Sequence, residues 1–145
     1  MDVLILNWRG PNDPLAGGSE TYLMEVAKRL SSKYRITLVC RRPKGLPKEE
    51  VVDGVRVVRV GGQYTVYLRA ALEYMKRGAD FVIDNINGIP FFTPLYVRKP
   101  KLAIIHHLAR EIFFLELPYP LAVVGWLAEN SIPFIYRKVK FGVVS

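Results

Sequence analysis

The sequence has almost none of the residues that build disulfide frameworks and thiolate metal sites. Among its 145 residues there are one cysteine, Cys40, and two histidines. A single cysteine excludes a disulfide scaffold, and it leaves a cysteine-based metal cluster without enough ligands. A lone thiol is also compatible with a reducing compartment.

Long hydrophobic runs are missing as well. The longest apolar region, Ile112 to Ala128, is broken by Glu116, Pro118 and Pro120, whereas a membrane span needs about 20 predominantly apolar residues. The apolar start VLIL is short and follows Asp2 rather than basic residues, unlike a signal peptide. We therefore expect a cytoplasmic protein without a spanning helix.

Neither of the common nucleotide-binding glycine motifs is present. The absence of GxGxxG removes the main support for a nicotinamide or flavin site, and the absence of GxxxxGK[ST] removes the P-loop. A different pair, Gly17-Gly18, stands before the first predicted helix.

Positive charge is abundant, with a net charge of +8. A nucleic acid, an anionic membrane or a phosphorylated ligand would each suit it. A thermophile-like surface explains it equally well, because Lys, Arg, Val and Ile are plentiful and Gln63 is the only glutamine. Arg41, Arg42, Lys44 and Lys48 cluster in one stretch, but no nucleic-acid motif accompanies them, so no nucleic-acid partner is predicted.

Short apolar strands alternate with helical patterns along the chain. This alternation predicts a mostly parallel sheet covered on both faces, a Rossmann-like three-layer α/β domain over residues 1–145. On the second helix, Tyr67, Ala71, Tyr74 and Met75 are expected on or near the buried face. The predicted strands cover 2–7, 35–40, 55–60, 80–84, 101–106 and 141–145, and the helices 18–33, 64–77 and 121–138, the last interrupted by Pro133.

Ligands of such sheets bind outside the carboxyl ends of the strands, which selects residues 7–18, 84–87 and 106–111. Gly17 and Gly18 lack Cβ atoms, so a ligand can approach the backbone closely, and the following helix start suits phosphate. A flexible hinge into the helix is the structural alternative for this pair.

Polar side chains follow the fourth and fifth predicted strands. Asp84, Asn85 and Asn87 lie where a ligand crevice is expected, although turn formation explains them equally well. His106 and His107 are adjacent on an extended segment, so their side chains point in opposite directions. One of them would face the crevice. The alternative is a histidine in the core or at its rim whose hydrogen bonds are made within the protein.

Two further features follow these histidines. Arg110 and Glu111 could bind substrate or form an exposed ion pair. Aromatic residues between Ile112 and Trp126 lie near basic residues and could meet a membrane surface, or they could belong to the core.

The order and spacing of these segments resemble the N-terminal half of retaining glycosyltransferases of family 4, which have the GT-B fold. Those enzymes begin with a strand, a loop and Gly-Gly-x-Glu opening the first helix, as Gly17-Gly18-Ser19-Glu20 do here. The resemblance covers nearly the whole chain, through the further segments DNINGIPFFTPLYV, KPKLAIIHHLAREIFF, PYPLAVVGWLAE and IYRKVKFGVVS.

The resemblance implies transfer of a sugar from a nucleotide-diphosphate sugar to an acceptor hydroxyl with retention, without a metal or other cofactor. It implies that Gly17 and Gly18 bind the donor phosphates. It places His106 beside the transferred sugar, with His107 where many relatives carry another polar residue. The weaker candidates for acceptor or cleft contacts are Glu20, Asn85, Asn87, Arg110 and Glu111.

The resemblance also implies a second, C-terminal domain that binds the nucleotide-sugar, and residues 1–145 do not include one. We expect this chain alone to be inactive, whether it is a fragment, half of a split enzyme with a partner chain, or a stand-alone module. Its exposed cleft face could then form a homodimer. A non-enzymatic module that binds a lipid, glycan or protein partner, with peripheral contact to the inner membrane face, is the alternative.

Overall fold

The structure, a computed structural model, describes residues 1–14, 16–87, 89–107 and 119–143. In this part of the chain, seven strands form one sheet in the order β3-β4-β2-β1-β5-β6-β7. All neighbouring pairs are parallel except β3 and β4. The strands are β1 (Asp2–Leu6), β2 (Arg35–Cys40), β3 (Glu49–Val52), β4 (Val55–Arg59), β5 (Phe81–Asn87), β6 (Lys101–His107) and β7 (Lys140–Val143).

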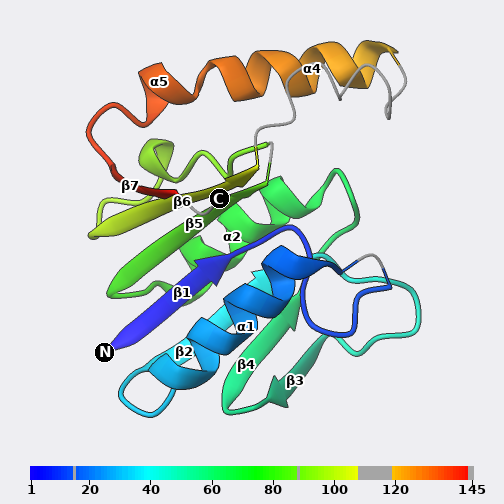
Figure 1. Cartoon of the computed structure of the whole chain (residues 1–145), viewed down its shortest axis with the longest axis vertical. Coiled ribbons are helices and arrows are strands. Elements are labelled where there is room, and N and C mark those ends of the chain that lie inside the picture. Colours follow the sequence, from blue (N-terminus) through cyan, green and yellow to red (C-terminus); the bar gives the residue numbers. More distant parts are fainter. Residues whose placement is uncertain (15, 88, 108–118, 144–145) are drawn as a thin grey trace.

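Helices cover both faces of the sheet (Figure 1). Successive side chains of a strand point to opposite faces, so Val3 and Ile5 of β1 pack under α1 while Leu4 and Leu6 pack under α2. The predicted α/β architecture with a mostly parallel sheet is confirmed. The helical elements are α1 (Gly18–Leu30), α2 (Val66–Arg77), the short η1 (Thr93–Leu95), α4 (Tyr119–Asn130) and α5 (Ile132–Ile135).

A third apolar cluster attaches α5 to the sheet. Ile132 and Tyr136 pack against Ile86 of β5 and Ala103 of β6. Pro133 was expected to interrupt a long helix, but it lies in the first turn of α5, where a missing backbone N–H costs nothing. The break between the two helices falls at Ser131 instead.

Three sequence predictions need correction. β3 (Glu49–Val52) was not predicted; it lies between the predicted strands 35–40 and 55–60. The fully buried residues of α2 are Val66, Ala70 and Glu73; Tyr67 and Tyr74 pack against the same core as predicted, whereas Met75 is 70% exposed. β5 extends to Asn87, so Asp84, Asn85 and Asn87 lie within the strand rather than after it.

Candidate functional site

The carboxyl ends of β1 and β5 are joined by a buried pair of amide side chains. Leu6 and Asp84 are neighbours in the parallel ladder, which brings Asn7 beside Asn85. The Nδ2 of Asn85 donates to the Oδ1 of Asn7 at 3.0 Å, and the Nδ2 of Asn7 donates to the carbonyl of Arg9 at 2.6 Å. Both amides are buried. The amide pair therefore fixes the point at which the chain leaves β1, and the side chain of Asn85 is buried and engaged by Asn7.

Glu20 closes the loop between β1 and α1. One carboxylate oxygen accepts a hydrogen bond from the backbone N–H of Gly17 at 2.7 Å, and the other accepts from the indole Nε1 of Trp8 at 3.2 Å. The guanidinium of Arg9 stacks over the Trp8 ring, 3.9 Å from its centroid. Because Glu20 is buried and both of its oxygens are engaged, the structure gives it a positioning role at the helix start.

Two arginines tie this loop to the loop that follows β2. Arg41 donates to both carboxylate oxygens of Asp13 at 2.7 Å, and this hydrogen bonding raises the pKa of Arg41. Arg59 donates to the carbonyls of Pro11 at 2.9 Å and Pro47 at 3.1 Å. Arg41 had been assigned to an exposed basic cluster, but its side chain is largely buried and paired with Asp13.

Gly17 and Gly18 are exposed, and neither is required by the packing of the chain. A Cβ built on Gly18 has nothing within 4 Å, and one on Gly17 meets only a Glu20 carboxylate oxygen at 3.8 Å. At Gly10, by contrast, a Cβ would lie 2.4 Å from the Sγ of Cys40. Gly10 thus serves internal packing, whereas the pair at the start of α1 leaves its backbone open to approach from outside.

Asp84 lies fully buried under α5 and the segment that contains η1. Its carboxylate accepts hydrogen bonds from the hydroxyl of Thr93 at 2.9 Å and the backbone N–H of Phe91 at 3.3 Å. The hydroxyl of Tyr136 also donates to it. Burial raises the pKa of Asp84 above its usual value, and the hydrogen bonds oppose that shift. Asp84 therefore links three elements within the interior, where its carboxylate is shielded from any ligand at the surface.

The contribution of Asp84 to stability is expected to fall as pH rises. Its folded-state pKa lies above the unfolded value of about 3.9, so the stabilisation is complete below that value and is lost as pH rises through the raised pKa. Urea unfolding of the wild type and Asp84→Asn between about pH 3 and pH 7 measures this contribution by difference. The difference in free energy should shrink with pH, and a difference that grows with pH would contradict the assignment.

The remaining predicted site residues are described only in part. Asn87 and His107 are register partners across β5 and β6, next to an irregularity between Ile86 and Asn87. His106 lies in the same stretch of β6. The side chains of Asn87, His106 and His107 lie outside the described part of the structure, as do Arg110 and Glu111 entirely.

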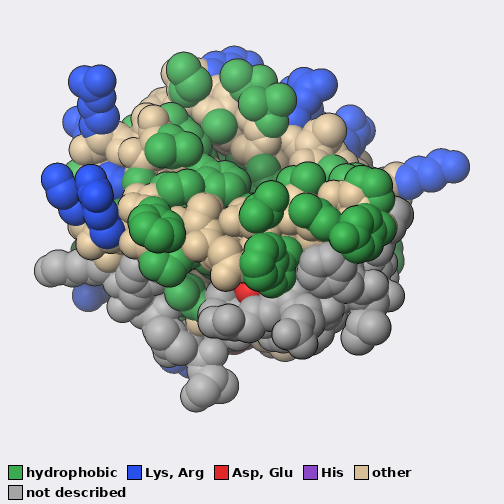
Figure 2. All heavy atoms as spheres, turned by 90° about the horizontal axis from the view of Figure 1, so that it is seen from above, with side chains coloured by type: hydrophobic (Ala, Val, Ile, Leu, Met, Phe, Trp, Pro, Cys, Tyr) green, Lys and Arg blue, Asp and Glu red, His purple; other side chains and the backbone are tan. Residues whose placement is uncertain are grey.

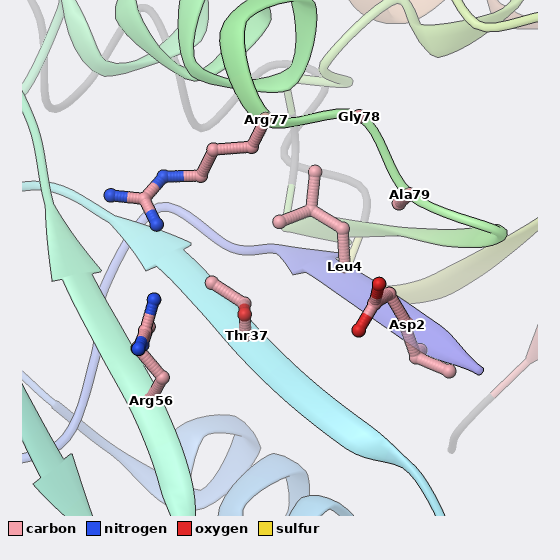
Figure 3. A pocket seen from close by; sticks show the side chains of 8 residues that line it. Asp2, Leu4, Thr37, Arg56, Arg77, Gly78 and Ala79 are labelled. Carbon is pink, nitrogen blue, oxygen red and sulfur yellow. The ribbon is translucent and has the colours of Figure 1, made fainter.

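A hollow at the opposite edge of the sheet does not belong to this site. It has a volume of about 260 Å³ and lies at the amino ends of the strands, with side chains from β1, β2, β4 and the end of α2 (Figure 3). Arg77, one of its two arginines, is engaged by Glu73 and Glu49. Over the described ranges, no group of three His, Cys, Asp or Glu side chains could hold a metal ion.

No protein-family model matches the chain, and no curated protein matches it either. A functional assignment therefore depends on the geometry of the carboxyl edge of the sheet and on the motifs that lie there.

Proposed function

We propose that this chain is the acceptor-side domain of a retaining glycosyltransferase of the GT-B type. The observation that carries the proposal is the open pair Gly17-Gly18, where a Cβ would meet almost no protein atoms. The pair opens α1 after the loop that leaves the carboxyl end of β1, and Glu20 in the first turn of the helix is bonded back to Trp8 of that loop. Ligands of parallel sheets bind at the carboxyl edge, and helix starts with unpaired backbone N–H groups favour phosphates.

In the proposed reaction, the acceptor hydroxyl oxygen bonds to the anomeric carbon of the sugar as the bond to the diphosphate oxygen breaks. Negative charge then develops on the leaving nucleoside diphosphate. The backbone N–H of Gly18 would stabilise that charge because it is oriented before the reaction begins, whereas the N–H of Gly17 is engaged by Glu20 and helps to hold the helix start in place. Glu20 and the Asn7–Asn85 pair hold the loop in place, and His106 is proposed to lie beside the transferred sugar.

The substitution Gly18→Ala distinguishes a role of the helix start in phosphate binding from a role in folding. The added methyl group has open space around it, and alanine is favoured over glycine in helices, so the free energy of unfolding should rise by up to about 1 kcal/mol. A diphosphate approaching the backbone would meet that methyl group. We expect wild-type amide shifts at residues 17–20 on titration with uridine or guanosine diphosphate sugars, and at least roughly tenfold weaker binding by the variant.

Glu25→Ala, a change at an exposed position of the same helix, is the matched control and should bind as the wild type does. Binding by folded Gly18→Ala equal to that of the wild type would contradict the proposal, as would shifts centred on residues 41–48. We expect no sugar transfer by the 145-residue polypeptide alone, because one domain supplies only one wall of a two-domain cleft.

A second candidate function, a module that binds an anionic lipid surface, is favoured by the exposed face of α4 and α5. Apolar side chains gather on this face, with lysines and arginines around its edge (Figure 2). Phe134 is 76% exposed and borders a hollow of about 540 Å³ together with Lys101, Arg137 and Lys138. Apolar insertion and attraction to anionic lipids together suit a bilayer surface. None of the described helices is long and apolar enough to cross a membrane.

Flotation with vesicles that contain phosphatidylserine tests this second function. The wild type should float with the vesicles at low salt, and Phe134→Ala should float much less while keeping its stability, because the side chain is exposed. Met75→Ala removes an equally exposed apolar side chain from α2 and should float normally. If Phe134→Ala floats as well as the wild type, or if the wild type stays at the bottom of the gradient, this face is excluded as a membrane contact.

A further inference from the structure

A groove of about 360 Å³ runs between α2 and the loop that follows β2, and cationic side chains dominate its lining. Arg42 and Lys48 approach it from the loop, and Arg69 and Lys76 approach it from α2. It begins where β4 ends, at Val60 and Gly61. Its volume falls in the range of roughly 300–1,000 Å³ that is usual for sites of small ligands.

Carboxylates in the described part of the chain leave these four cations without an ion-pair partner. Of the lining residues that the structure describes, Glu73 alone is acidic, and it is engaged by the Nε of Arg77 at 2.6 Å. Arg59 also borders the groove, but its charge is paired with Glu50. A hollow lined by uncompensated charge of one sign concentrates ions of the opposite sign.

The backbone at Gly61 brings two of the lining residues together. Gly61 has a φ of +64°, and a Cβ there would lie 2.7 Å from the Oγ1 of Thr65 and 3.0 Å from the Cγ of Arg69. The missing side chain therefore lets the stem of Arg69 lie directly against the turn between β4 and α2. On the other side, the Nε of Arg42 donates to the carbonyl of Leu46 at 3.1 Å, which orients its guanidinium. The guanidinium of Arg42 is thus oriented on one wall of the groove, and the stem of Arg69 is packed against the turn on the other.

We propose that this groove binds a small ligand through a phosphoryl or diphosphoryl group. Guanidinium forks match the oxygens of a phosphate, and several adjacent negative charges are needed to balance four cations. No aromatic side chain is among the described residues of the lining, so the groove offers no stacking surface for a base of a nucleic acid. The site is separate from the Gly17-Gly18 backbone and does not depend on the proposed glycosyltransferase function.

Calorimetric titration with inorganic pyrophosphate, at low and at physiological salt, tests the assignment. The wild type should show saturable binding at one site, and Lys48→Gln combined with Arg69→Gln should weaken it at least tenfold. Both changes are at exposed positions, so the folded state should survive, which circular dichroism and thermal unfolding can verify. Arg29→Gln combined with Lys33→Gln removes the same charge from exposed positions on and just after α1 and should leave the affinity within a factor of about two.

Equal weakening by both pairs of substitutions would show that only overall charge matters, and it would overturn the proposal. The absence of pyrophosphate binding by the folded wild type would overturn it as well. Titration with a single-stranded RNA oligonucleotide tests whether the phosphates of a nucleic acid bind instead of a small ligand. If RNA binds much more tightly than pyrophosphate, and both pairs of substitutions weaken RNA binding equally, the groove is part of a general polyanion surface.

Discussion

Arg59→Ala is expected to lower the free energy of unfolding by about 3–5 kcal/mol, because it breaks a buried ion pair and leaves its partner behind. Arg59 is 1% exposed, and besides pairing with Glu50 it donates to the carbonyls of Pro11 and Pro47. Removing the guanidinium leaves both carbonyls without this donor and opens a cavity between the two loops. Urea or guanidinium unfolding, followed by circular dichroism, measures the loss.

Arg56→Ala is the matched control for this experiment. Arg56 lies on the same strand, its side chain is exposed, and no carboxylate among the described residues forms an ion pair with it. Its replacement should change the free energy of unfolding by no more than about 0.5 kcal/mol. Similar losses for the two variants would mean that Arg59 contributes only as a residue of the strand and does not hold the loops together.

Tyr136→Ala is expected to be destabilising to a similar degree, about 3–5 kcal/mol, through the cavity that it leaves under α5. Tyr136 is fully buried and packs with Ile86 and Ala103 of the sheet. Its hydroxyl also donates to Asp84, so the substitution removes a hydrogen bond from a buried carboxylate. Thermal and urea unfolding both report the change.

Phe134→Ala, two residues earlier in α5, serves as the control for Tyr136→Ala. It removes a comparable ring that is mostly exposed, and its effect on stability should stay below about 1 kcal/mol. A small loss for Tyr136→Ala would show that α5 is not held against the sheet by this side chain. Together the pair separates the inner and outer faces of one short helix.

The main elements of the fold are predictable from local pattern, because buried parallel strands are short apolar runs and helices repeat with a period of 3.6 residues. β3 was missed, although Asp53-Gly54 joins it to β4 and such a dipeptide between valine-rich segments is a strong hairpin signal. Half of β3 consists of the charged residues Glu49 and Glu50, so it lacks the apolar pattern by which the other strands were predicted. Edge strands tolerate and often carry such charges.

The rotation of α2 about its axis could not be predicted from periodicity alone. The pattern gives the width of an apolar stripe, but packing decides which part of it faces the sheet. Glu73 is buried on that face because Arg77, one turn later, pairs with it at 2.6 Å. Met75, two residues after Glu73 in the helix, lies on the outside, contrary to the sequence prediction.

The sequence predicts which residues lie at the carboxyl edge of the sheet, but it does not predict the contacts that support them. The carboxyl edge of the sheet follows from the topology rule, which selected Gly17, Gly18 and Asn85. The bonds that join Asn85 to Asn7 and Asp84 to Tyr136 connect residues 78 and 52 positions apart, and no local pattern specifies such partners. They depend on the order of strands and on where each strand ends.

Trp8 is an intrinsic fluorescent reporter on the loop between β1 and α1. The chain has two tryptophans; Trp8 lies on the loop before α1, and Trp126 lies on α4. The emission of an indole changes with its hydrogen bonding and with nearby charge, and the Trp8 indole is bonded to Glu20 and stacked on Arg9. A Trp126→Phe protein would therefore carry a single intrinsic fluorophore that follows movement of the first loop, and a Trp8→Phe protein one that follows the environment of α4.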